Sequence, residues 1–144
     1  MTVTPRTRFV TSADGTAIAY DVTGTGPAVV VVEGALCQRT MGTARAVAPL
    51  LSELYAVVAY DRRDRGESGP GSSPYAVQRE VEDLVARGAA GGHPRAEGRA
   101  VRGKSPVYME NAQAALATAL PGGALRELPG QTHIVRGKAT VPVL

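Results

Sequence analysis

Few residues of this chain could perform nucleophilic or acid–base chemistry. There are two histidines, His93 and His133, and a single cysteine, Cys37. A histidine acts as a general base only when a nucleophile lies within hydrogen-bond reach of it. Cys37 could in principle be that nucleophile for His133, but nothing around it in the sequence predicts an activated thiol, and free cysteines are mostly small buried apolar groups. We therefore expect Cys37 to be a packing residue.

Other motifs give no support for a cofactor, a metal or a nucleic acid. Gly24-Thr25-Gly26 precedes an apolar Val run instead of following one, as a dinucleotide-binding turn would. No histidine pair or carboxylate cluster has the spacing of metal ligands. Arg62, Arg63 and Arg65 are interleaved with acids and have no aromatic platform for bases, so we interpret them as part of a solvated loop. We expect no cofactor, no metal ion and no nucleic-acid partner.

The composition is that of one globular domain. Single domains usually have about 100–200 residues; this chain has 144, of which 44% are apolar and 20% charged. The formal charge is +3, and between Arg87 and Lys104 five basic residues accompany a single acid, Glu97. A lone cysteine favours a reducing compartment. No segment has the apolar length of a signal peptide or a membrane span, so we expect a cytoplasmic protein without a membrane partner.

The first 60 residues have the pattern of an α/β fold. Residues 8–11 and 16–22 predict a hairpin with a turn at Asp14-Gly15. The apolar runs over 28–32 and 55–60 predict strands buried on both faces, as in a parallel sheet. Between them, apolar residues at helical spacing predict a helix over 43–54, which Pro49 would kink or shorten. Strand, helix and strand in this order predict a right-handed parallel crossover.

A long polar loop then leads into a second helix. Ser73 can cap that helix with Pro74 at its first position, and apolar residues recur at helical spacing as far as Arg87. Residues 88–103 contain no apolar run and no period. Their Gly-rich composition is that of a linker or a disordered loop.

Regular patterns return in the last third of the chain. A helix is predicted over 105–120, a strand over 124–128 and a loop over 129–133. The chain is thus interpreted as a single domain with an N-terminal block over 6–87, a patternless linker over 88–103 and a C-terminal block over 104–144.

These two blocks resemble parts of the α/β-hydrolase fold family. The Val run ends in Glu33-Gly34-Ala35, and the next strand is followed by Asp61-Arg62-Arg63-Asp64-Arg65-Gly66-Glu67-Ser68-Gly69. In that family the third strand usually ends in His-Gly and the fourth in Asp-x-x-Gly-x-Gly-x-Ser, so Glu33 stands in place of the His and Asp64 in place of a glycine. The C-terminal block, ending in Gly130-Gln131-Thr132-His133, resembles the last part of the same fold.

The resemblance implies a nucleophile elbow between the two blocks, and the sequence lacks it. That strained strand-to-helix turn needs Gly-x-Ser-x-Gly. The nearest serines, Ser68 and Ser105, lack the second glycine and follow no buried strand, so we expect a loop residue and a helix cap. Lys104 and Ser105 also stand where the family places its catalytic Asp or Glu. The chain therefore resembles an internally truncated member of the family.

The resemblance also implies which residues remain from a catalytic site. His133 occupies the place of the family's general base, with a plain loop histidine as the alternative. Gly34 and Ala35 would provide half of an oxyanion hole through a backbone N–H, unless Gly34 serves only a tight turn. Glu33 could be an acid or base at the mouth of the site, or a carboxylate that is solvated or paired with an arginine. His93 is expected to be solvated.

The predicted fold class is therefore α/β, with an α/β-hydrolase-like, mostly parallel sheet that begins with an N-terminal hairpin, is flanked by helices and lacks its central part. The resemblance implies hydrolysis of an ester, amide or similar bond in a small-molecule substrate, impaired or lost because the Ser nucleophile is absent. The alternative is a non-catalytic binding module, or a homo-dimer in which another copy covers the unfilled sheet edge.

Overall fold

The structure is a computed structural model that describes residues 6–34, 36–71, 74–90, 99–104, 107–119 and 124–132. The chain divides into two units, Met1–Pro94 and Arg95–Leu144. Within the described residues, no helix combines the length and the apolar character needed to cross a membrane.

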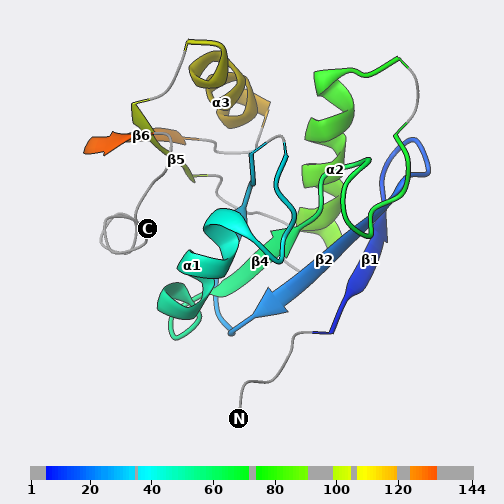
Figure 1. The fold of residues 1–144 in the computed structure, drawn as a ribbon, viewed down its shortest axis with the longest axis horizontal. Helices are drawn as coiled ribbons and strands as arrows, with labels where there is room; N and C mark the ends of the chain where they lie inside the picture. The colour runs from blue at the N-terminus through cyan, green and yellow to red at the C-terminus, as the bar shows by residue number, and fades with distance from the viewer. Residues whose placement is uncertain are drawn as a thin grey trace. The chain divides into compact units, whose positions relative to one another are not determined.

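The first unit is built on a four-stranded mixed sheet (Figure 1). Its strands are β1 (Arg8–Thr11), β2 (Ala17–Thr23), β3 (Ala28–Val31) and β4 (Ala56–Tyr60), in the order β1-β2-β4-β3. β2 is antiparallel to β1 and to β4, whereas β3 and β4 are parallel. The predicted hairpin and the predicted parallel crossover are both confirmed, and so is the α/β class of the fold.

The turn between β1 and β2 follows the local sequence closely. The Ser12 N–H donates to the Thr16 carbonyl over 2.8 Å, and the Asp14 carboxylate accepts from the Thr16 N–H over 3.1 Å. Gly15 has a φ of 87°, in the left-handed region that glycine enters without a steric penalty. The Asp-Gly pair therefore sets the register of the hairpin.

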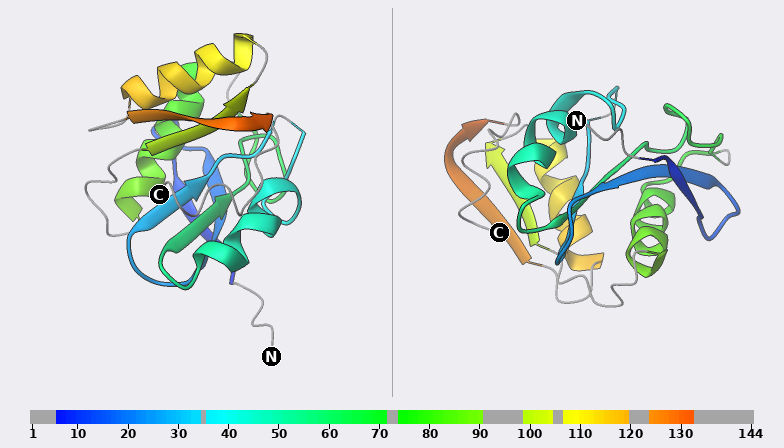
Figure 2. Two further views of the ribbon diagram at one scale, coloured as in Figure 1. Left: turned by 90° about the vertical axis from the view of Figure 1, so that its left-hand side faces the viewer. Right: turned by 90° about the horizontal axis from the view of Figure 1, so that it is seen from below.

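Two helices, α1 (Gly42–Leu51) and α2 (Val77–Ala90), pack on opposite faces of this sheet (Figure 2). On the α2 face, four buried side chains form a core cluster to which Leu84 is packed, and on the other face α1 buries three of its apolar residues. The cluster consists of Ile18, Tyr20, Val58 and Tyr60, and the α1 residues are Ala44, Val47 and Leu51. Side chains of a strand alternate between faces, so β4 contributes to both layers.

The helix bounds differ from the predicted ones at several ends. α1 ends at Leu51 instead of residue 54. α2 begins at Val77 instead of Pro74, and Ser73 lies outside the described residues. It also continues to Ala90, beyond the predicted end at Arg87.

The second unit contains β5 (Arg99–Lys104), α3 (Val107–Ala119) and β6 (Ala124–Thr132), and β5 and β6 are parallel neighbours (Figure 1). A linker was predicted over 88–103. This prediction is wrong for residues 88–90, which belong to α2, and for residues 99–103, which belong to β5. β5 contains two arginines, Arg99 and Arg102, which suit a buried parallel strand badly. Pairing with β6 provides its backbone with hydrogen-bond partners, and strand formation depends strongly on such context.

β6 is also longer than predicted. It continues through residues 129–132, where a loop was expected. Glu127 pairs with Arg102 and Thr132 with Lys104, so four residues of β6 lie opposite one residue of β5. This irregularity accommodates Pro129 and Gly130 within the strand, as bulges generally do.

Candidate functional site at the ends of β3 and β4

Glu33, directly beyond β3, caps the amino-terminal end of α1. The residue before the helix, Met41, provides no side-chain cap. Instead the Glu33 carboxylate accepts hydrogen bonds from the backbone N–H groups of Thr43, over 3.1 Å, and of Ala44, over 2.5 Å. A Cβ on Gly42 would lie 2.6 Å from a Glu33 oxygen, and Gly42 has a φ of +70°. Glycine is therefore required there on two grounds.

This geometry decides between the interpretations of Glu33. The side chain was expected to be solvated, paired with an arginine, or placed at the mouth of a site, but it is only 4% exposed. Its charge is stabilised by the partial positive charge of a helix N-terminus and by two orphan N–H donors. Position 41 carries none of the usual capping residues Ser, Thr, Asp or Asn. This is the sequence signal that could have indicated that a residue distant in the sequence caps α1.

Gly34 lies on the surface in the loop after Glu33. Its carbonyl accepts from the Cys37 N–H over 3.1 Å, and an added Cβ would meet nothing within 4 Å. Its φ is not in the left-handed region, so the turn itself does not require glycine. No described residue accepts a hydrogen bond from its N–H. Ala35, the other oxyanion-hole candidate, lies outside the described residues.

Asp61, at the end of β4, is the centre of a buried ion-pair network. It is 1% exposed and accepts from the Arg39 N–H over 2.8 Å, from the Arg39 guanidinium and from the Glu67 N–H over 3.0 Å. Arg39 also donates to Asp21 over 3.0 Å, to the Thr7 hydroxyl over 2.9 Å and to the Glu67 carboxylate. The hydrogen bond from Arg39 lowers the pKa of Glu67. The network joins the loops that follow β3 and β4 to β2.

The prediction that the arginines after Asp61 lie in a solvated loop is wrong for Arg62 and Arg63. Arg63 is 4% exposed and donates to Asp83 over 2.9 and 2.7 Å and to Asp14 over 2.8 Å. Arg62 donates to Glu80 over 2.7 and 2.6 Å. Glu80 and Asp83 are three positions apart on α2 and therefore lie on one face of that helix. This face neutralises both arginines, and these hydrogen bonds raise the pKa of each.

Hydrogen bonds from Asp64 and Ser68 hold the loop after β4. Asp64 has a φ of 62°, a left-handed conformation that Asp tolerates better than most residues. Its carboxylate accepts from the Gly71 N–H over 2.8 Å. The Ser68 hydroxyl donates to the Asp61 carbonyl over 2.7 Å and accepts from the Ala19 N–H over 2.9 Å. Ser68 is thus confirmed as a loop residue that ties this loop to β2.

Arg87 is a buried cation that the sequence reasoning missed. It is 2% exposed, and its guanidinium carbon lies 3.6 Å from the centroid of the Tyr20 ring, as in a cation–π contact. Its Nε and Nη1 atoms find no hydrogen-bond partner among the described residues. Burial lowers the pKa of Arg87 to about 10. No local pattern marks this residue, since the aromatic ring comes from β2, far away in the sequence.

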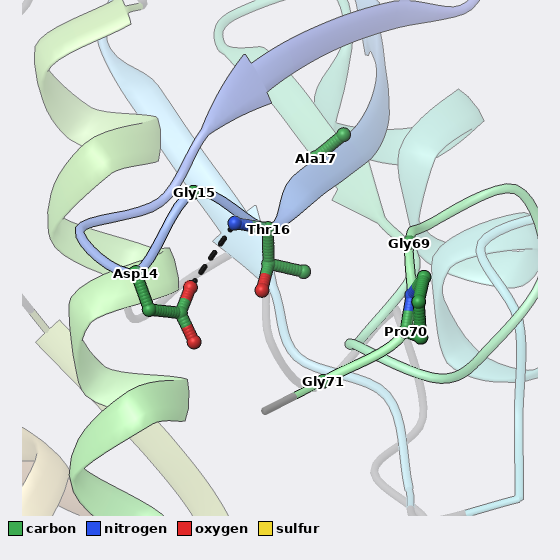
Figure 3. Close-up of a pocket in the computed structure, with 7 residues that line it drawn as sticks. All are labelled: Asp14, Gly15, Thr16, Ala17, Gly69, Pro70 and Gly71. Atoms are coloured by element: carbon green, nitrogen blue, oxygen red, sulfur yellow. Dashed lines mark hydrogen bonds between the residues drawn. The ribbon is translucent and has the colours of Figure 1, made fainter. Parts of the chain in front are cut away.

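A shallow hollow lies between the β1–β2 turn and the loop after β4 (Figure 3). Its volume is about 370 Å³, and it is lined by Asp14, Gly15, Thr16, Ala17, Gly69, Pro70 and Gly71. The Asp14 carboxylate already accepts from Thr16 and from Arg63. The lining contains no Ser, Cys or His side chain, so we assign no chemistry to this hollow.

Most of the remaining candidates are not described by the structure. His133, His93 and Ser105 lie outside the described residues. Cys37 is half-buried. In the part of the chain that the structure describes, no group of three or more His, Cys, Asp and Glu side chains could hold a metal ion.

Comparisons place this fold among known proteins. No protein-family model and no curated protein matches the chain. Among solved structures, an alpha/beta hydrolase from Sphaerobacter thermophilus is 38% identical over 83% of this chain and 44% of that chain, with a TM-score of 0.64. An esterase from Rhodococcus sp. is 26% identical over 83% and 42%, with a TM-score of 0.64. A thermophilic esterase from Thermogutta terrifontis is 25% identical over 79% and 39%, with a TM-score of 0.58.

The chain belongs to the α/β-hydrolase fold family. It spans less than half the length of these solved structures. The first unit comprises 94 of the 144 residues, about 65% of the chain, so a match over 83% also includes residues of the second unit. The matched region therefore extends beyond the first unit, and the shorter length is consistent with an internally truncated member.

Proposed function

We propose that this chain derives from hydrolases that cleave an ester, amide or similar bond of a small molecule, and that its own hydrolytic activity is impaired or absent. The observation that carries this proposal is the lack of Gly-x-Ser-x-Gly anywhere in the sequence. Two of the solved structures described above are named esterases, which favours an ester as the ancestral substrate. Ser68 is no substitute nucleophile, because its hydroxyl already bonds Asp61 and Ala19.

In this proposal His133 is the remnant of the general base, and the Gly34 N–H is the remnant of the oxyanion hole. Loss of the nucleophile alone lowers kcat by about 10⁶ in a serine hydrolase. Loss of one oxyanion donor lowers the rate by about 10²–10³. A chain with a base and one donor but no nucleophile should therefore hydrolyse an activated ester little faster than water does.

The test combines a rate and a covalent probe on the full chain. We expect hydrolysis of p-nitrophenyl acetate close to the uncatalysed rate, and no mass increase after incubation with a fluorophosphonate, which labels activated serines. His133→Ala should lower any residual rate, whereas His93→Ala, which changes the other histidine, should not. A stoichiometric fluorophosphonate adduct on a serine would contradict the loss of the nucleophile. If the unaltered chain hydrolyses the ester measurably faster than the uncatalysed reaction, an equal rate for His133→Ala would contradict the role of His133.

A further inference from the structure

One edge of the sheet in the first unit, along β3, has no described strand beside it. β3 pairs with β4 on one side only, and no described strand pairs with its other side. The Pro27 carbonyl accepts from the Ala56 N–H over 2.9 Å and so points toward β4. Because the N–H and C=O of one residue share a side and the sides alternate along a strand, Ala28, Val30 and Val32 present theirs to the open edge.

The sequence of this edge contains none of the residues that normally keep sheet edges from pairing. Native proteins protect such edges with charged side chains, prolines or bulges. The segment Ala28-Val29-Val30-Val31-Val32 contains none of these. The opposite edge, β1, differs because it carries the exposed Arg8. An uncharged run of β-branched residues with unpaired backbone groups is suited to receive another strand.

We propose that two copies of this chain associate through β3, with the two strands antiparallel about a twofold axis at Val30. The Val30 residues of the two copies would exchange both of their backbone hydrogen bonds, and Ala28 of each copy would do so with Val32 of the partner subunit. This gives about six inter-subunit hydrogen bonds. The resulting sheet is continuous across the dimer, and the twofold axis uses the β3 edge of both copies.

A second copy suits this edge in charge. Pairing β3 with itself brings no like charges together, because the segment has none. Pairing β1 with itself would bring two Arg8 side chains into the same interface. Like charges across neighbouring strands destabilise the pair.

A second copy also suits the edge in its apolar surroundings. At the carboxyl end of β3, Val32 is 46% and Leu36 85% exposed. At the amino end, Leu54 is 65% exposed, and its carbonyl is 2.7 Å from the position of a Cβ on Gly26. An antiparallel twofold arrangement places the amino end of one strand beside the carboxyl end of the other. The exposed leucines would then lie near the two ends of the paired strands.

The first test is the concentration dependence of mass for the full chain, measured by sedimentation equilibrium. We expect a closed dimer of about twice 14.9 kDa. Val30→Pro removes the central N–H donor from both copies but no β3–β4 hydrogen bond, so the Kd should rise at least about tenfold. Thr11→Pro is the matched control: the Ser12 N–H points toward β2, so the Thr11 N–H faces away from the sheet at the other edge.

Hydrogen exchange of the unaltered chain, resolved by residue, tests the same pairing without a variant. The amides of Ala28, Val30 and Val32 should exchange more slowly as the dimer forms, whereas those of Val29 and Val31, which face β4, should not change. A monomer at all concentrations, a mass that grows beyond the dimer, a dimer more sensitive to Thr11→Pro than to Val30→Pro, or the opposite alternation of protection would each overturn the proposal. None of these results depends on whether the chain hydrolyses esters.

Discussion

The cap that Glu33 provides for α1 has a stability effect that can be worked out from its contacts. Glu33→Gln preserves the size of a side chain that is 4% exposed, but it replaces one acceptor oxygen by an NH₂ donor that faces a backbone N–H of Thr43 or Ala44. Loss of a cap costs about 0.5–2 kcal/mol, and a hydrogen bond to a charged group is worth about 1.5–3 kcal/mol. Because these two values describe overlapping contacts, they are not added, and we expect the free energy of unfolding to fall by about 2–3 kcal/mol.

The assay is thermal unfolding of the full chain followed by circular dichroism. At about 4 °C for each kcal/mol, Glu33→Gln should lower the Tm by about 8–12 °C. Glu53→Gln is the control, because it makes the same chemical change at an exposed residue and should leave the Tm nearly unchanged. If the two variants melt at the same temperature, the Glu33 carboxylate does not stabilise α1 and the reasoning is refuted.

Two further predictions concern the ion pairs. In a denaturant titration, Arg63→Met should lower the free energy of unfolding by about 3–5 kcal/mol, because it leaves the 1%-exposed Asp83 unpaired. The double variant Arg63→Met with Asp83→Leu should recover most of that loss. Arg39 lowers the pKa of Glu67 in the folded chain. The Glu67–Arg39 pair therefore stabilises the fold at pH values above the pKa of an unfolded Glu, and this stabilisation is lost as the pH falls through the lower folded pKa. The Tm of the unaltered chain should therefore fall in acid more than that of Glu67→Gln, and parallel curves would contradict the role of this pair.

The parts of the fold that the sequence predicted are those specified by neighbouring residues. The hairpin depends on Asp14-Gly15 and a short alternating pattern, and β3 and β4 are unbroken apolar runs. Such signals lie within a few positions of each other. β5 could not be predicted in this way, because its residues 99–104 become a strand only through pairing with β6, about 25 positions later.

The polar interior of the first unit was missed for the same physical reason. Glu33 bonds to residues 10 and 11 positions away, and Arg63 bonds to Asp83, 20 positions away. In the sequence, the arginines and acids after β4 are mixed along one short segment, and that mixture indicates a solvated loop. Only the packing of α2 on the sheet shows that Arg62 and Arg63 have carboxylate partners on another element.

The span of the ion pairs bears on how a chain of this family could survive the loss of an internal segment. The carboxylates that neutralise Arg39, Arg62 and Arg63 all lie between Asp14 and Asp83. Deleting chain beyond α2 therefore separates none of these charges from its counterion. The first unit is in this sense a self-contained module, whose inheritance does not depend on the part of the gene that would encode the nucleophile.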